Sequence, residues 1–267
     1  MNNWYESSIK SLVEEYFREH GFSVVFDSSE FWDVFIEKYH KQIPSSQIAL
    51  FDQVAAEARS YAFNKKYGTY SYLTDYRSVC KNWNQIILDE IQKILGKNLT
   101  SKKVLALGAN NGSELAIIFE DFFKSMNFDV VEISEAACSS GKSLYPHINF
   151  VCASMDEVDL PENEFDIFIS LRAAYCAGNN LDFIVNKAIH SVKPGGVIIF
   201  SISNGYIDVT DSKYTPIKGV YNPENQHCDE TETKRNINWM ETAMLANGCS
   251  EVTLVDAESE ILLVSRR

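Results

Sequence analysis

The chain has 267 residues, of which 45% are hydrophobic and 12% aromatic, and its formal net charge is −13. This composition is sufficient for a sizeable core and is not typical of a disordered chain. The acidity disfavours a protein that binds a nucleic-acid backbone or an anionic membrane surface, because both partners need clustered Lys and Arg side chains.

The chain contains six cysteines, and no two of them form a Cys-x-x-Cys pair. We interpret them as reduced thiols, several of them buried. The segment Gln-His-Cys-Asp at 226–229 has no partner cluster, so we expect no metal site. The first ten residues lack the pattern of a signal peptide, and no apolar stretch approaches the roughly 20 residues that span a bilayer. We expect a soluble, cytoplasmic protein.

The first 99 residues are predicted to form helices. Apolar residues recur at the helical period in four segments, and Gly21, Pro44 and Gly96 are suited to end three of them. The segments lie at residues 9–17, 31–39, 48–62 and 79–94. We predict an N-terminal helical cap over residues 1–99 that recognises the substrate.

From residue 100 onward, short apolar runs alternate with helical stretches. Such alternation predicts a doubly wound α/β domain over residues 100–267, with a mostly parallel sheet covered on both faces. The last two runs are too close for a crossover helix, so they form an antiparallel C-terminal hairpin. The seven predicted strands lie at 104–107, 129–131, 150–152, 165–169, 197–200, 251–255 and 261–264.

Residues 104–112, V-L-A-L-G-A-N-N-G, lead from the first predicted strand into a helix at 113–120. Gly108 and Gly112 stand where the backbone bends or approaches a ligand. No Gly-Lys-Ser/Thr follows, so this is not a Walker A loop. Glu132 ends the next strand, where a carboxylate can accept hydrogen bonds from both hydroxyls of a ribose. The alternative is an ordinary acidic residue at a strand end.

These segments, followed by NFVCASMDEVDLPENEFDIFIS, SVKPGGVIIFSIS and MLANGCSEVTLVD in the same order, resemble the class I S-adenosylmethionine-dependent methyltransferases. The resemblance implies a Rossmann-like catalytic domain that uses S-adenosylmethionine as its cofactor. It places Glu132 at the ribose and Ile133, Ser154 and Met155 around the adenine. The remaining cofactor-binding residues expected in this domain are Gly108, Ala109, Asn110, Gly112 and Leu171.

Two positions depart from the family pattern. The acid usual in the first strand is Ala106, and the middle glycine of the turn is Asn110. Asparagine tolerates positive φ better than most residues, and its amide could replace lost contacts to the methionine part of the cofactor. The segment Lys-Pro-Gly-Gly at 193–196 is interpreted as a structural turn into the fifth strand.

Residues outside the cofactor motifs are candidates for the acceptor side. Arg172 follows the fourth strand and could hold a carboxylate, or form a surface salt bridge instead. Tyr175 could shape the acceptor site or pack as a core aromatic. His227, in a long polar segment at 204–236, is the candidate general base, the alternative being a solvated side chain. By resemblance, Tyr76 and Arg77 are candidates for the cofactor carboxylate.

The sequence thus predicts a methyltransferase acting on an oxygen or nitrogen of a small molecule or peptide. A peptide C-terminal carboxylate is included, because an ionised carboxylate needs no base. We expect no nucleic-acid or membrane partner. Two alternatives stay open: a nicotinamide dehydrogenase, and a degenerate methyltransferase fold that serves as a scaffold, for which Ala106 and Asn110 are the motivation.

Overall fold

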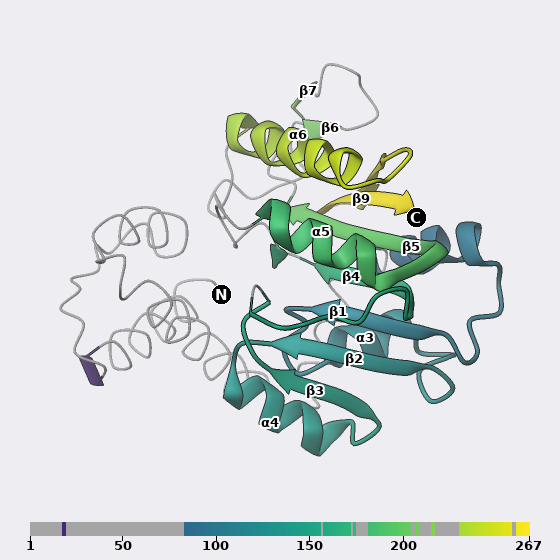
Figure 1. Ribbon diagram of the computed structural model, residues 1–267, viewed down its shortest axis with the longest axis vertical. Helices are drawn as coiled ribbons and strands as arrows, with labels where there is room; N and C mark the ends of the chain where they lie inside the picture. The colour runs from purple at the N-terminus through teal and green to yellow at the C-terminus, as the bar shows by residue number, and fades with distance from the viewer. Residues whose placement is uncertain are drawn as a thin grey trace.

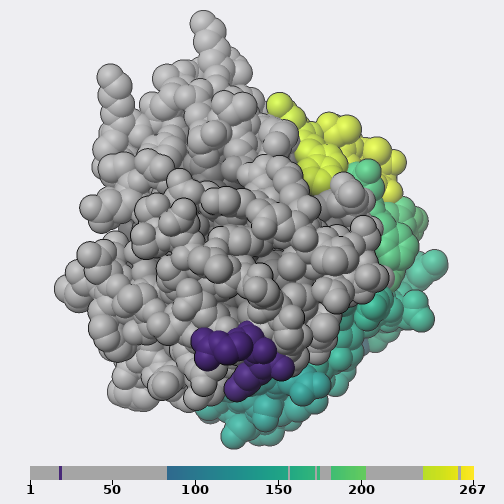
Figure 2. All heavy atoms as spheres, turned by 90° about the vertical axis from the view of Figure 1, so that its left-hand side faces the viewer, coloured from purple at the N-terminus to yellow at the C-terminus, as the bar shows by residue number. Residues whose placement is uncertain are grey.

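A computed structural model describes residues 18–19, 83–155, 157–171, 173–174, 181–203, 207–208, 215–216, 230–257 and 260–267. Arg18 and Glu19 are exposed at the surface and appear in purple in Figure 2. A helix spans residues 83–95 and stops before Gly96 (φ 83°). The expected stop at Gly96 is confirmed.

Helices and strands alternate after residue 100, as expected. In chain order they are β1 (Lys103–Leu107), α3 (Ser113–Ile118), β2 (Asn127–Glu132), α4 (Glu135–Leu144), β3 (Ile148–Cys152), β4 (Phe165–Leu171), α5 (Leu181–Ser191), β5 (Val192–Ser203), β6 (Ile207–Asp208), β7 (Thr215–Pro216), α6 (Glu230–Ala246), β8 (Thr253–Ala257) and β9 (Glu260–Arg266).

Seven strands form one sheet in the order β3-β2-β1-β4-β5-β9-β8. The first five are parallel to one another, while β9 runs antiparallel to both β5 and β8. In Figure 1 the carboxyl ends of the parallel strands lie on the left and the C-terminus of the chain on the right. The predicted doubly wound sheet with its antiparallel C-terminal hairpin is confirmed, while the helical segments expected at 9–17, 31–39 and 48–62 lie outside the described residues.

An apolar layer packs on each face of the sheet, and the two layers together bury its central strands. One layer packs the helix at 83–95, through Trp83, Ile87 and Ile91, together with α3 and part of α4. The other layer packs α5 and α6. Figure 1 shows α5 and α6 in front of the strands and α3 behind them. Residues 83–95, which the predicted boundary at residue 99 assigns to the cap, thus share the core of the sheet.

The structure differs from the expected elements in three places. The segment at 193–196 lies inside β5, since Val192 already pairs with Phe165 before a register shift, and Gly195 adopts φ 84°. Helix α6 begins at Glu230, which shortens the expected loop at 204–236, and a small β6–β7 pair lies within that segment. Strand β8 starts two residues later than its predicted run. Local apolar patterns do not reveal such pairings.

Among the residues described, no helix is both long enough and apolar enough to cross a membrane.

Candidate functional site

The turn after β1 has three residues with positive φ. They are Gly108 (φ 69°), Asn110 (φ 51°) and Gly112 (φ 79°). The Gly108 N–H donates to the carbonyl of Val131 at 2.8 Å, which ties the turn to β2. A Cβ atom on Gly108 would lie 2.4 Å from the Cβ of Ala173, so this position excludes every larger residue. The bend expected at Gly108 is therefore present, and the structure adds close packing against Ala173.

Glu132 ends β2 and is only 7% exposed. Its Oε2 accepts a hydrogen bond from the Asn110 N–H at 2.9 Å, and its Oε1 accepts one from the Ser134 N–H at 3.0 Å. The carboxylate therefore connects the turn after β1 with the start of α4. It lies at the carboxyl edge of the sheet, where ligands of doubly wound folds bind.

The side-chain amide oxygen of Asn110, Oδ1, is buried in an unusual environment. It has no hydrogen-bond partner in the part of the chain that the structure describes. An acceptor left unpaired away from water costs about 1–3 kcal/mol, so such atoms in native proteins usually have a ligand or water to satisfy them. The Asn110 backbone is bound to Glu132 at the same time, so the orphaned oxygen belongs to the same group of residues.

The loops after β2, β3 and β4 meet at this turn. Ile133, Ser154 and Met155 are all half-buried. The Met155 Cε would lie 3.9 Å from a Cβ on Gly108, next to Ala173 from the segment after β4. Leu171 is 8% exposed and packs in the core as the last residue of β4. The structure thus brings Gly108 and Met155 together, with Glu132 on the adjoining strand.

Ala106 is 1% exposed and belongs to the same apolar cluster as Trp83 and Ile87. A carboxylate at this position would have to be buried among hydrocarbon side chains, which is costly without a partner. The alanine therefore matches its surroundings, and the family's usual acid does not have an obvious place here.

Sequence analysis missed two polar features. Ser201 and Glu260 are 1% and 3% exposed, and the Ser201 hydroxyl donates to the Glu260 Oε2 at 3.0 Å. They lie at the carboxyl end of β5, where Ser203 pairs with Glu260. Asn84 is 4% exposed, and neither polar atom of its side chain has a partner among the described residues. The only available signal was a polar residue inside an apolar stretch, which does not distinguish a site from a structural contact.

Five predicted residues lie outside those that the structure describes: Tyr76, Arg77, Arg172, Tyr175 and His227. Their roles stay predictions. Within the described ranges, no group of three or more His, Cys, Asp or Glu side chains is arranged to hold a metal ion.

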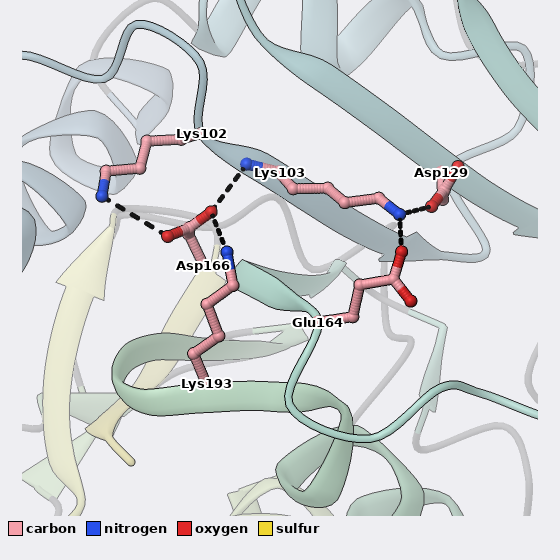
Figure 3. Close-up of polar contacts among 6 residues, drawn as sticks. All are labelled: Lys102, Lys103, Asp129, Glu164, Asp166 and Lys193. Atoms are coloured by element: carbon pink, nitrogen blue, oxygen red, sulfur yellow. Dashed lines mark hydrogen bonds and ion pairs between the residues drawn. The ribbon is translucent and has the colours of Figure 1, made fainter.

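The opposite, amino-terminal edge of the sheet is closed by ion pairs (Figure 3). Asp166 accepts the Lys103 N–H at 2.9 Å and the Lys193 ammonium at 3.0 Å, and it pairs with Lys102 at 3.4 Å. The Lys103 ammonium binds both Asp129 and Glu164. This group of six side chains, the amino-edge network, joins β1, β2, β4 and β5.

The pKa values of the network follow from these contacts. Burial alone would raise the pKa of Asp166, but the hydrogen bonds from Lys103 and Lys193 and the charge of Lys102 outweigh it, so the pKa is lowered. Burial alone would lower the pKa of Lys103, but its bonds to Glu164 and Asp129 raise it. Each charge is matched by its partners, and the network offers no group for chemistry.

Comparison with known proteins agrees with the α/β fold and the glycine turn after β1. Residues 104–196 match a family described as a methyltransferase domain. None of the curated proteins compared with the chain is similar to it in sequence.

Solved structures are similar in fold at low sequence identity. An S-adenosylmethionine-dependent methyltransferase from Aquifex aeolicus has a TM-score of 0.54 at 9% identity, covering 78% of this chain and 97% of that one. A putative S-adenosylmethionine-dependent methyltransferase from Methanococcus maripaludis has a TM-score of 0.53 at 14% identity, covering 76% and 93%. Human N-acetylserotonin methyltransferase, in complex with S-adenosylmethionine, has a TM-score of 0.54 at 12% identity and covers 97% of this chain and 66% of that one.

The strand order, with β9 inserted antiparallel between β5 and β8, and the glycine turn beside Glu132 define a class I methyltransferase fold. Residues 104–196 match a methyltransferase domain, and the fold is shared with S-adenosylmethionine-dependent methyltransferases, which supports S-adenosylmethionine as the cofactor. The nicotinamide dehydrogenase hypothesis is set aside.

The donor and acceptor groups at the carboxyl edge fit this cofactor. Its ribose hydroxyls are donors that suit the Glu132 carboxylate, and its ammonium is a donor that suits the orphaned Asn110 Oδ1. When bound, the cofactor supplies a methyl group already activated by its sulfonium.

Proposed function

We propose that this protein transfers a methyl group from S-adenosylmethionine to an oxygen or nitrogen atom of a small molecule or peptide. The observation that most directly supports an active enzyme is the buried Asn110 Oδ1, which has no partner among the described residues and lies beside the Glu132 carboxylate. A scaffold has no reason to keep this unsatisfied acceptor buried, since it costs stability without a ligand.

Each residue of the cofactor site has a stated task in this proposal. Glu132 accepts from the ribose hydroxyls while its hydrogen bond from the Asn110 N–H fixes the turn. The Asn110 Oδ1 accepts from the ammonium of the methionine part. By resemblance, Ile133, Ser154 and Met155 border the adenine. Gly108 lets the turn pack closely against Ala173. Holding donor and acceptor in line is the main requirement of methyl transfer.

Two observations support a small molecule or peptide as the acceptor. The net charge of −13 disfavours a nucleic acid. The similarity to human N-acetylserotonin methyltransferase extends over 97% of the chain, beyond the residues that match the methyltransferase domain family. We therefore propose that residues 1–99 contribute to acceptor recognition, as a protein that methylates a small molecule requires.

The acceptor side would be formed at the carboxyl ends of β4 and β5. Arg172 and Tyr175 follow β4 in the sequence, and the buried Ser201–Glu260 pair lies at the end of β5. Arg172 would bind a carboxylate, and His227 would serve as the base for an acceptor that must lose a proton. A carboxylate acceptor would need no base, so loss of His227 would then leave the rate unchanged.

The test is calorimetric titration of the purified full chain with S-adenosylmethionine and S-adenosylhomocysteine. We expect micromolar binding of both ligands and a loss of about 100-fold in affinity for Glu132→Ala, since a hydrogen-bonded carboxylate contributes about 1.5–3 kcal/mol. Glu164→Ala, a carboxylate change at the amino edge, is the matched control and should keep full affinity. Absence of binding by the folded wild-type chain would contradict the enzyme and favour the scaffold.

A further inference from the structure

Two thiols lie directly beneath the residues assigned to the ribose and the adenine. Cys138 is in the first turns of α4, and Cys152 is the last residue of β3. The Cys138 Sγ donates to the carbonyl of Glu132 at 3.5 Å, and the Cys152 Sγ donates to the carbonyl of Ile133 at 3.7 Å. The two thiols thus donate to two consecutive carbonyls where β2 ends, and the Glu132 carbonyl also accepts the Ala153 N–H at 3.1 Å.

The thiols also contact each other, and their surroundings differ. Burial raises the pKa of Cys138 to about 12, and the nearby Cys152 sulfur contributes to the rise. Cys138 is 2% exposed, while Cys152 is exposed to solvent. A reagent in solution therefore meets Cys152 first, and Cys138 lies behind it within reach of the same sulfur.

We propose that Cys138 and Cys152 form a modification site at which low-molecular-weight disulfides oxidise the pair, and that the oxidised site binds S-adenosylmethionine more weakly. The effect on the cofactor rests on the proposed function, whereas the oxidation itself does not. Such a pair, one thiol accessible and one resolving, is the arrangement that thiol–disulfide exchange requires.

The exchange balances in two steps. Cys152 loses its proton to solvent and attacks one sulfur of the small disulfide, which releases one small thiol and leaves a mixed disulfide. Cys138 then loses its proton and attacks the Cys152 Sγ, which releases the second small thiol. One S–S bond is broken, one is formed in the protein, and two electrons pass from the two cysteines to the reagent.

The geometry explains why this would affect the cofactor. Disulfide formation removes both S–H donors, so the Ile133 carbonyl loses its bond from Cys152 and the Glu132 carbonyl keeps only the Ala153 N–H of these two donors. The new bond also pulls the end of β3 toward α4. Glu132 holds the Asn110 and Ser134 N–H groups from the same position, so a shift of this backbone displaces the turn as well.

The experiment uses the full chain, treated with glutathione disulfide and then with dithiothreitol. Peptide mass spectrometry should find a Cys138–Cys152 cross-link that dithiothreitol removes, while the buried Cys249 stays unmodified. The mixed disulfide at Cys152 should accumulate at pH 7 and close faster at pH 9, because Cys138 is hard to ionise. Affinity for S-adenosylmethionine should fall about fivefold on cross-linking and recover on reduction.

Two variants separate the steps. Cys152→Ser should form no cross-link and keep its affinity for S-adenosylmethionine under oxidation. Cys138→Ala, checked for folding by circular dichroism, should stop at the mixed disulfide. If oxidised wild-type protein has no cross-link between these cysteines, the modification site is wrong.

A cross-link without a change in affinity would overturn the coupling to the cofactor. If the reduced protein does not bind S-adenosylmethionine while the cross-link still forms, the proposed function and the coupling are both wrong. The proposal that Cys138 and Cys152 are an oxidation site is then still supported.

Discussion

The two edges of the sheet are built on opposite principles. At the amino edge, Asp166 and Lys103 have their charges matched by neighbours on four strands (Figure 3). At the carboxyl edge, a turn with three residues at positive φ meets a buried carboxylate and an acceptor oxygen that no group among the described residues satisfies. The charges of the amino edge are paired within the protein, whereas the carboxyl edge keeps an acceptor for the cofactor that we propose binds there.

This difference shows where the fold accepts a stability cost. Backbone strain and unpaired polar atoms are concentrated at functional sites because the surrounding structure stabilises them. Here β1 connects the two edges, since Lys103 begins it and Gly108 follows its end. We infer that changes at the amino edge affect stability, whereas changes at the carboxyl edge affect binding, except where a residue also packs tightly.

The largest effect is expected for Gly108→Ala. This change lies at the carboxyl edge but should reduce stability, because Gly108 is tightly packed. Its Cβ would lie 2.4 Å from that of Ala173 at a backbone φ of 69°. We expect a loss of about 3–5 kcal/mol in the free energy of unfolding, from positive φ and overpacking together. Urea denaturation measures it.

Gly96→Ala is the matched control for this change. Gly96 has φ 83°, but a Cβ there has no atom within 4 Å, so only the backbone strain of about 1–2 kcal/mol should be measured. The double variant Gly108→Ala/Ala173→Gly should recover the part due to the contact. Equal losses for Gly96→Ala and Gly108→Ala would show that the close packing is unimportant.

Asp166→Asn tests the completeness of the amino edge. We expect a loss of about 1–2 kcal/mol at pH 7, because three donors lose a charged acceptor. The pKa of Asp166 is lowered in the folded state. Its contribution to stability is therefore present above the unfolded pKa of about 3.9 and is lost as the pH falls through the folded value.

Urea denaturation of both proteins between pH 7 and pH 3.5 measures this dependence. The difference between wild type and Asp166→Asn should shrink below about pH 4. A difference that stays constant over this range would mean that the carboxylate's charge does not stabilise the fold. Affinity for S-adenosylmethionine at pH 7 should not change in the variant.

Local sequence patterns predict the elements that form the two edges of the sheet, but they do not predict the contacts between distant side chains. Continuous apolar runs predicted the strands, because parallel strands are buried on both faces, and short spacing predicted the hairpin of β8 and β9. The glycine turn and Glu132 were predicted from their place after strands. The contacts of Ser201 with Glu260, and of Cys138 with Cys152, join distant segments, so no local pattern shows them.

Asn110→Gly tests the orphaned acceptor at the carboxyl edge. Glycine accommodates φ 51°, so the change removes the amide without straining the turn. We expect affinity for S-adenosylmethionine to fall about tenfold, near 1.4 kcal/mol, as one hydrogen bond to a charged ammonium is lost. Affinity for 5′-methylthioadenosine, which lacks the ammonium, should stay the same in calorimetric titrations.

Asn163→Gly is the control for this change, because Asn163 also has positive φ (54°) but lies on the other edge, near Arg267. It should leave both affinities unchanged. Equal weakening of both ligands by Asn110→Gly would show that the Asn110 side chain supports the turn as a whole instead of binding the ammonium.

The smallest effect is expected for Lys193→Met at the amino edge. Its side chain is 44% exposed, so solvent weakens its pairing with Asp166, whereas Lys103 is less exposed and has two carboxylate partners. Methionine keeps the apolar stem and removes the charge. The free energy of unfolding should change by less than about 0.5 kcal/mol, and this change should decrease further in high salt. A loss above about 1.5 kcal/mol in urea denaturation would mean that the edge depends on its most exposed member. In that case the amino edge would not be complete without Lys193, and the contrast between the edges would be weaker than the contacts indicate.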